Sequence, residues 1–313
     1  MKSIRLFHTF SVLLICTSVI AQPTLSQSIP VEVLIENRFN GGEGLSFNHE
    51  GRLFICANRS MWEVTHDLQT HKVADFTSNL GLAPIGKRDL LKADFGPLIF
   101  PQHGTNNDGV VWRVTPEGDT TRIADNIGDP NAIVVLPDSS FLVSDDFTYN
   151  IYHVTPEGTV SVFTDAIPFP NGIALSPNGD ALYVARLFVK YPDEPPPARF
   201  QEFSDEVWRL PLRDFRPAGL AEVVFRTGGA TGPDGLAVDT EGRVYLSAAR
   251  EGQLWRFDPT TGKGELLAEG LPGLASIAFG QGKFDHESLY AMQIRGGRVL
   301  RFKVGAKGAR LFQ

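Results

Sequence analysis

The segment FPNGIALSPNGDALYVAR, residues Phe169–Arg186, contains Pro-Asn-Gly twice, on either side of a short apolar run. Pro-Asn-Gly is a common turn sequence, because Asn and Gly tolerate the backbone angles that tight turns require. The second copy, at Asn178, precedes another apolar run and predicts a hairpin turn. The first copy, at Asn171, has counterparts elsewhere in the chain. Those counterparts indicate the fold and a second role for this Asn.

The counterparts share a short pattern: a variable residue, a small residue, an aliphatic residue, a small residue and a hydrophobic residue. Six copies begin at Glu43 (EGLSF), Leu80 (LGLAP), Asn131 (NAIVV), Asn171 (NGIAL), Asp234 (DGLAV) and Ala275 (ASIAF). A second strand pattern follows each clear copy after a turn, as in EGRLFICA, and segments such as VWRVTPEGDTTRIA predict a further pair. A unit of four antiparallel strands in roughly 40 residues is the blade of a β-propeller. The sequence therefore predicts an all-β fold, a six-bladed β-propeller with four-stranded antiparallel blades.

The ends of the chain complete the predicted domain. The apolar strand VEVLIEN, Val31–Asn37, belongs to no repeat, and we expect it to pair with the last blade and close the ring. The sequence predicts a linker over residues 22–30 and a single propeller domain over residues 31–313. Two segments break the repeat, residues 95–109 and 187–206, and are predicted to be long loops. Long loops on a rigid scaffold either cover a site or are surface additions, and the sequence leaves both possibilities open.

The N-terminus has the features of a cleavable signal peptide. Lys2 and Arg5 precede an apolar run, and small residues before position 22 predict cleavage after Ala21. The run is too short for a membrane span. A signal peptide over residues 1–21 predicts a secreted or periplasmic protein. Its removal leaves Cys56 as the one cysteine, which excludes an intramolecular disulfide and a Cys-rich zinc site.

Charge and motifs exclude several function classes. The formal net charge is −7 and becomes more negative when the two cations of the signal peptide are removed. Such an acidic chain is not expected to bind nucleic acid or an anionic membrane. The sequence has no Gly-x-Ser-x-Gly elbow of a serine hydrolase and no phosphate-binding Gly-rich loop. We expect a monomer whose partner is a small molecule.

The leading residues of the six copies predict a metal site. In a propeller the first strand of every blade lines the central channel, so these residues take equivalent places near the axis. Four of the six carry side-chain oxygens: Glu43, Asn131, Asn171 and Asp234. Each alone fits a turn, but together they bury two carboxylates close to each other, which is costly unless a cation lies between them. Ca²⁺ accepts six to eight oxygen ligands in irregular geometry. The four residues are therefore predicted to bind Ca²⁺ or another divalent cation.

The chain resembles the SMP-30/gluconolactonase/LRE-like (regucalcin) family over its whole predicted mature length. The resemblance rests on the segments GEGLSF, DPNAIVVLPDSSFLVSDD, FPNGIALSPNGDALYVAR and GPDGLAVDTEGRVYLS. It implies a six-bladed propeller hydrolase with one catalytic divalent metal in the channel. It also implies that Glu43, Asn131, Asn171 and Asp234 are the metal ligands and that Asp234 doubles as the catalytic carboxylate. The segment LGLAPIGKRDLL lacks the substrate-binding signature of typical gluconolactonases.

The function predicted from this resemblance is metal-dependent hydrolysis of lactones or related esters. The metal would act as a Lewis acid, and Asp234 would act as general base or as nucleophile; the sequence does not choose between them. The alternative is a non-catalytic propeller that binds a ligand or protein and holds a structural calcium. A strictosidine-synthase-like propeller is a third possibility.

Two further pairs of residues have alternative interpretations. Asp145 and Asp146, in FLVSDD, either orient a ligand amide or form a solvated turn. Arg186 and Arg250 each end a second strand, and either place positive charge near the channel mouth or are solvated at the surface.

Overall fold

A computed structural model describes residues 29–96, 107–189 and 202–312 of the chain. The predicted signal peptide and most of the predicted linker lie outside these ranges, as do parts of both predicted long loops. Within the described ranges, no helix has the length and apolar character needed to cross a membrane.

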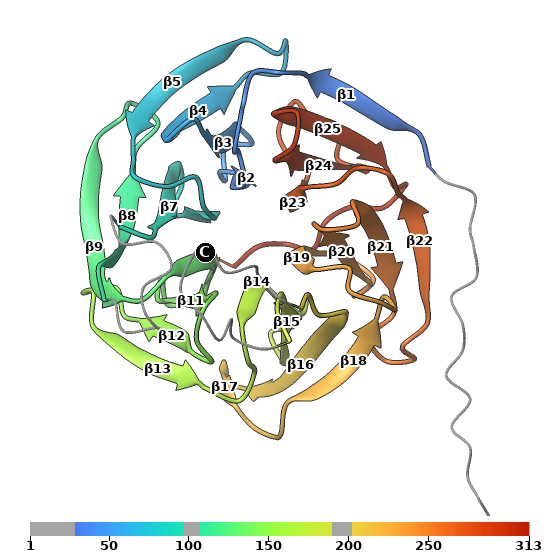
Figure 1. Ribbon diagram of the computed structural model, residues 1–313. Coiled ribbons are helices and arrows are strands. Elements are labelled where there is room, and N and C mark those ends of the chain that lie inside the picture. The colour runs from blue at the N-terminus through green and yellow to red at the C-terminus, as the bar shows by residue number, and fades with distance from the viewer. Residues whose placement is uncertain (1–28, 97–106, 190–201, 313) are drawn as a thin grey trace, which may run out of the picture.

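Six antiparallel sheets surround a central channel, and each runs outward from an inner strand to a rim strand (Figure 1). This confirms the predicted six-bladed β-propeller. The first blade consists of β2 (Leu45–Phe47), β3 (Leu53–Ala57), β4 (Ser60–Val64) and β5 (Thr70–Asp75), and the second of β6 (Leu82–Ile85), β7 (Asp89–Asp94), β8 (Gly109–Val114) and β9 (Thr120–Ile127). The third consists of β10 (Pro130–Val135), β11 (Phe141–Asp145), β12 (Ile151–Val154) and β13 (Val160–Thr164), and the fourth of β14 (Pro170–Leu175), β15 (Ala181–Arg186), β16 (Glu206–Arg213) and β18 (Glu222–Arg226), with β17 (Arg216–Pro217) beside the end of β16. The fifth consists of β19 (Pro233–Val238), β20 (Val244–Ala248), β21 (Gln253–Phe257) and β22 (Gly264–Ala268), and the sixth of β23 (Leu274–Phe279), β24 (Ser288–Gln293), β25 (Arg298–Lys303) and β1 (Val31–Ile35).

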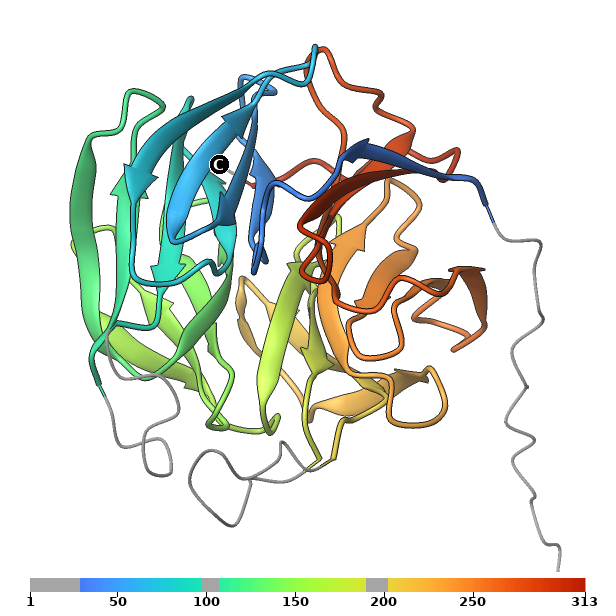
Figure 2. The ribbon, with the colours of Figure 1, turned by 45° about the horizontal axis from the view of Figure 1, so that its top comes forward.

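The N-terminal strand closes the ring, as the sequence predicts. β1 pairs antiparallel with β25, with Val31 opposite Phe302, and so becomes the rim strand of the sixth blade. Figure 2 shows this blue strand lying beside the red C-terminal strand. Because the first and last parts of the chain share one sheet, unravelling either end breaks hydrogen bonds to the other.

Apolar side chains fill the spaces between neighbouring blades. Strand alternation directs Ile133 and Val135 of β10 into the same cluster as Ala83 and Leu91 of the preceding blade. Aromatic rings fill the corresponding space elsewhere, as where Phe225 of the fourth blade stacks on Phe257 of the fifth at 4.3 Å. Each blade buries both faces in this way, which explains why the inner strands read as nearly continuous apolar runs.

The small residue at the second place of the repeat lets the inner strands approach each other closely. A Cβ atom at Gly172 would lie 1.9 Å from the carbonyl oxygen of Asp234 in the next blade. A Cβ at Gly81 would lie 2.2 Å from the carbonyl oxygen of Asn131, which accepts a 3.1 Å hydrogen bond from the Gly81 amide. Both glycines therefore stand where one blade's backbone touches the next. This contact sets how closely the leading residues of neighbouring blades can meet.

The C-terminal segment crosses one end of the channel. It leaves β25 and turns inward, where Ala309 donates a 2.8 Å hydrogen bond to Val238 and Thr240 donates a 3.0 Å bond to Lys307. Phe312 packs edge-on against Phe215 at 5.2 Å. Figure 1 shows the C-terminus at the centre of the ring.

We predict that Gly172→Ala destabilises the protein by about 3 kcal/mol, because the added methyl group must displace the Asp234 backbone. Urea unfolding measures this cost. Gly219→Ala is the matched control, because Gly219 is exposed and its Cβ would lie 3.3 Å from the Pro211 ring. The control should change stability by less than about 0.5 kcal/mol. Equal effects of the two substitutions would contradict the close contact.

Candidate functional site

The four predicted ligands lie at the same end of their blades, at or just before the first strand. Asn131, Asn171 and Asp234 are the second residues of β10, β14 and β19, and Glu43 lies two residues before β2. The structure therefore places them in four different blades. Asn131, Asn171 and Asp234 are buried, and Glu43 is half-buried.

A β-bulge lies at the start of these inner strands. In β10 the partners change from Pro130 with Asp145 to Ile133 with Val143, so three steps along one strand match two along the other. The same shift occurs at the starts of β14, β19 and β23. A bulge re-aims the side chain beside it. The bulge therefore explains how the polar leading residue of an inner strand can point in a different direction from the residues after it, which pack between blades.

Asn131 connects two carboxylates. Its Nδ2 donates a 3.0 Å hydrogen bond to Oε1 of Glu43 and a 2.7 Å bond to Oδ2 of Asp146. The amide nitrogen has two hydrogens, so these two bonds use both of them. The amide oxygen must then point away from both carboxylates. Among the alternatives left open by the sequence, Asp146 therefore orients a candidate ligand and is not a solvated turn residue.

The two remaining candidates differ in their contacts. Asp234 has its pKa raised well above its usual range, first by burial and then by the negative charge of Glu43. The structure thus brings Asp234 into electrostatic range of Glu43. Asn171 makes no side-chain contact with the other three among the described interactions, and its buried Oδ1 has no hydrogen-bond partner. Its backbone is held in place, because the Ser144 hydroxyl donates a 2.6 Å hydrogen bond to its carbonyl oxygen.

Burial dominates the electrostatics of the acidic group. It raises the pKa of Glu43, and it raises the pKa of Asp146 well above the usual range, with the charge of Glu43 as the next cause. Asp145 is also buried, and burial raises the pKa of its carboxyl. Glu43, Asp146 and Asp234 interact with one another, since the charge of Glu43 raises the pKa values of the other two, and such a group favours protons or a cation.

Lys92 is a charged residue that the sequence analysis missed. It is fully buried in β7, where its Nζ donates hydrogen bonds to the carbonyl oxygens of Ala93 (2.6 Å) and Ser78 (2.9 Å) and lies 3.7 Å from Oδ1 of Asp94. Its positive charge lowers the pKa of Glu43 but does not offset the effect of burial. A lysine at an apolar position of the strand DLLKAD is the signal that could have identified it.

Arg186 has a structural role. It forms a 2.9 Å ion pair with Glu206 and donates hydrogen bonds to the carbonyl oxygens of Phe188 and Val189. The positive charge of Arg186 is therefore paired with Glu206 inside the fourth blade. Arg250, the other arginine considered from the sequence, is exposed.

The residues fit a hard divalent cation by their chemistry. All four candidates offer oxygen atoms, the unpartnered Oδ1 of Asn171 is a buried acceptor, and the acids lack enough positive charge nearby. No cluster of three or more His, Cys, Asp or Glu that could hold a metal occurs in the part of the chain that the structure describes. The predicted set contains two acids and two amides.

A cavity of about 540 Å³ occupies the other end of the channel. The ends of the inner strands and the C-terminal segment line it, including Phe47, Phe279 and Phe312, and none of the four candidates does. Its lining is mainly apolar. It is therefore distinct from the candidate metal centre.

Comparison with known sequence families finds one match, over part of the chain. The sequence model of the SMP-30/Gluconolactonase/LRE-like region matches residues 143–295. This part of the chain is an SMP-30/gluconolactonase/LRE-like region. The match confirms the resemblance over this range, which includes Asn171 and Asp234 and begins after Glu43 and Asn131. No curated protein matches the chain significantly in sequence.

Solved structures of low sequence identity share the fold of this chain. A calcium-binding protein, regucalcin, from Agrobacterium tumefaciens is 20% identical, with a TM-score of 0.66 over 93% of this chain and 98% of that one. A gluconolactonase from Xanthomonas campestris is 16% identical, with a TM-score of 0.65 over 89% of each chain. A luciferin-regenerating enzyme is 15% identical, with a TM-score of 0.64 over 91% of this chain and 100% of that one.

We predict that Asp146→Asn stabilises the metal-free protein at pH 8 by about 1 kcal/mol or more, because it removes one of three facing carboxylates. The usual pKa values of these acids are 3.8 and 4.5. Between those values and the raised folded values, the folded chain binds more protons than the unfolded chain. The free energy of unfolding of the wild type therefore falls as the pH rises through this window. The advantage of the variant should disappear towards pH 4.

Urea unfolding in the presence of a chelator at several pH values measures the Asp146→Asn effect. Asp138→Asn is a control of opposite sign, because hydrogen bonds from Ser140 lower the pKa of Asp138. That variant should lose stability at pH 8, and the loss should shrink as the pH falls through the lowered pKa. A destabilised Asp146→Asn at pH 8 would show that the acids do not repel one another.

Proposed function

We propose that this protein is an exported hydrolase of lactones or related esters that depends on Ca²⁺ or a similar divalent cation. The observation that carries the proposal is the set of oxygen atoms at one end of the channel. Glu43 and Asp234 lie in electrostatic range of each other, Asn131 bonds Glu43, and the buried oxygen of Asn171 has no partner. The SMP-30/gluconolactonase/LRE-like match and the fold shared with a gluconolactonase and a calcium-binding regucalcin support the same function.

The cation, when bound, supplies a Lewis acid that polarises a carbonyl oxygen. Glu43, Asn131, Asn171 and Asp234 would hold it. Asn131 is kept in one orientation by Asp146 and Glu43, so its oxygen is available without rotation of the amide. Preorganised dipoles of this kind lower the cost of charge that develops during ester hydrolysis.

Asp234 is the catalytic carboxylate in this proposal. Burial and the charge of Glu43 raise its pKa, which makes it a better proton acceptor than an exposed aspartate. It would take a proton from the attacking water or attack the carbonyl carbon itself. Both steps need a carboxylate at this place.

Asn171 and Asn178 provide a matched pair, because both stand in Pro-Asn-Gly. Asn178 lies in the exposed turn between β14 and β15, where its Nδ2 donates a hydrogen bond to Asp180. We predict that Asn171→Ala reduces the rise in melting temperature caused by Ca²⁺ to less than half, whereas Asn178→Ala keeps it. Without the cation, Asn171→Ala should lose little stability, because its oxygen has no bond to lose. Equal Ca²⁺ responses of the two variants would remove Asn171 from the site.

We predict that Asp234→Asn lowers kcat for a hydrolysed lactone by about a thousandfold, the scale of acid–base catalysis. The experiment screens aliphatic, aryl and sugar lactones and aryl esters after chelation and after return of Ca²⁺, Mg²⁺, Mn²⁺ or Zn²⁺. Chelator-sensitive turnover supports the hydrolase. Chelator-sensitive melting without turnover of any substrate would support the non-catalytic propeller with a structural cation instead.

A further inference from the structure

The loops between the second and third strands of the blades lie beside the candidate metal centre. This follows from strand register, because the residue before each leading residue pairs with the end of the second strand: Pro233 with Ala248, and Leu274 with Gln293. Residues just after the second strand therefore surround this mouth of the channel. In blade order, the residues one or two places beyond that strand are Arg59, Phe95, Phe147, Phe188, Arg250 and Arg295.

Five of these positions are equivalent in strand register, and Phe95 stands one place earlier than its equivalents. Together the six residues divide the mouth into two halves. Three neighbouring blades, the second to the fourth, carry phenylalanine there. The other three, the fifth, sixth and first, are also neighbours in the closed ring, and they carry arginine. The division is therefore spatial as well as chemical.

The aromatic half is one connected arc of rings. Phe147 lies 6.2 Å from Phe95 and 6.1 Å from Phe188, measured between ring centroids, and Phe188 lies 5.3 Å from Phe203. The arc thus crosses three blades and ends at Phe203. Phe203 packs beside Gly232, which lies just before the inner strand of the fifth blade. Phe95, Phe147 and Phe188 are buried, whereas Phe203 and Leu187, next to Phe188, are partly exposed. Side chains of this kind offer no hydrogen bonds to a polyhydroxylated substrate.

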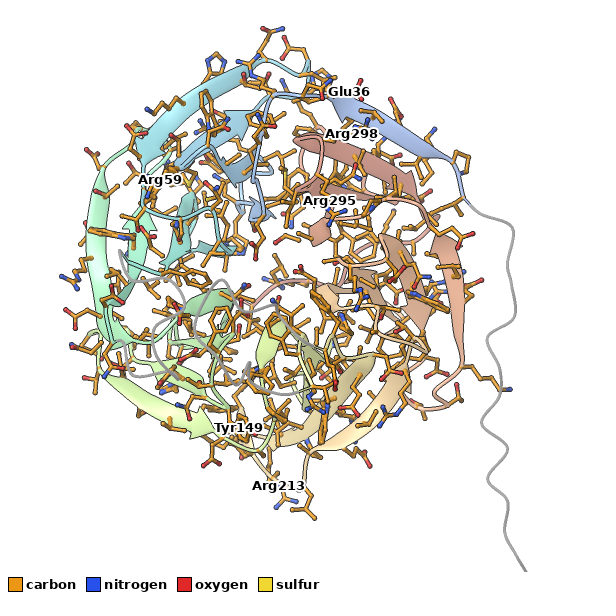
Figure 3. The ribbon with its side chains drawn as sticks, viewed as in Figure 1. Glu36, Arg59, Tyr149, Arg213, Arg295 and Arg298 are labelled. Carbon is orange, nitrogen blue, oxygen red and sulfur yellow. The ribbon has the colours of Figure 1, made fainter. Side chains whose placement is uncertain are left out.

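The arginine half is exposed. Arg250 lies over the Phe203 ring at 5.3 Å, where the two halves meet, and has an exposed partner in Glu251 at 3.5 Å. The Arg295 side chain forms no hydrogen bond or ion pair with the described residues. Arg298 of the same blade, by contrast, is bound to Glu36 at 2.6 Å. Figure 3 shows Arg295 closer to the centre of the ring than that pair.

Arg59 occupies a backbone conformation that usually selects glycine. It follows Asn58 in a two-residue hairpin turn, and both have positive φ, 55° for Asn58 and 58° for Arg59. Asn-Gly is the usual sequence for such a turn, and a larger residue at the second place costs roughly 1 kcal/mol. The Arg59 backbone is held there by the 2.7 Å hydrogen bond from its amide to Asn79. A strained, exposed cation at the mouth is consistent with a role in binding.

We propose that the divided mouth selects substrates that combine an apolar aryl or acyl group with an anionic group. The inference rests on the proposed hydrolase function and names its substrate class: lactones or esters that carry a carboxylate. Phe203 and Leu187, the partly exposed residues beside the buried phenylalanine arc, contact the apolar part, and Arg59, Arg250 and Arg295 attract the anion. Local positive charge at the mouth matters more because the chain as a whole carries a formal charge of −7.

The test compares three lactones with the wild type and with a triple variant, Arg59→Gln, Arg250→Gln and Arg295→Gln. The lactones are dihydrocoumarin, a dihydrocoumarin with a ring carboxylate, and a sugar lactone with a carboxylate. We expect the carboxylated aryl lactone to have the highest kcat/KM. In the triple variant the ratio of kcat/KM for the carboxylated over the neutral aryl lactone should fall about tenfold, and 0.5 M salt should have a similar effect on the wild type.

Arg213→Gln is the control, because this exposed arginine lies on the outer edge of the ring (Figure 3). It changes the net charge by the same unit as each mouth substitution and should leave the ratio unchanged. Thermal melting shows that every variant is folded. An unchanged ratio in the triple variant would overturn the arginine part of the proposal. Equal kcat/KM for the carboxylated sugar and aryl lactones would overturn the aromatic part.

A second measurement separates this inference from the proposed function. Calorimetry measures binding of the aryl hydroxy acid that dihydrocoumarin gives on ring opening, and of its neutral amide. If no lactone or ester is hydrolysed with any cation, the hydrolase proposal fails. The binding result then still tests whether the divided mouth recognises an anionic aryl ligand. Tighter binding of the acid than of the amide, lost in the triple variant, supports the divided mouth. Equal binding of acid and amide by the wild type overturns it.

Discussion

The contact between neighbouring inner strands determines most of this structure. At Gly172 and Gly81 the backbone of one blade stands against the carbonyl oxygen of the next, at a distance that no Cβ atom permits. Serine hydroxyls strengthen the same junction, as where Ser247 donates a 2.5 Å hydrogen bond to the carbonyl oxygen of Ala275. A narrow channel follows, and with it the close approach of polar side chains from separate blades.

That approach has an energetic cost that the rest of the fold offsets. Burial raises the pKa values of Glu43, Asp146 and Asp234, and each of the latter two is raised further by Glu43. The buried ammonium of Lys92 opposes only part of this effect. The apolar layers between blades supply the stability that permits such a site, since proteins place locally unfavourable arrangements where function needs them. A cation or protons would relieve the repulsion, which links the chemistry of the site to its stability.

The repeat also explains how one backbone supports different chemistry at equivalent places. The leading positions supply oxygen atoms in four blades and apolar groups, Leu80 and Ala275, in two. The residues one or two places after the second strands are phenylalanine in three adjacent blades and arginine in the other three. Because strand register fixes where each position lies, a single side-chain change alters the site without altering the ring. The opposite end of the channel has a different structure: the C-terminal segment crosses it, and an apolar cavity lies there.

The sequence alone determined the ring, because a repeated strand pattern can bury its two faces only against copies of itself. It also predicted that β1 would close the last blade and that Asn178 would be a turn. Tertiary structure decided which side chains meet. The hydrogen bond between Asn131 and Glu43 joins residues 88 apart in the chain. Arg186, which the sequence offered as a positive charge near the channel mouth, forms an ion pair with Glu206 instead. Alternation along a strand identifies a face, but a bulge changes the direction of the side chain beside it. That direction depends on hydrogen-bond register, which the amino-acid pattern does not specify.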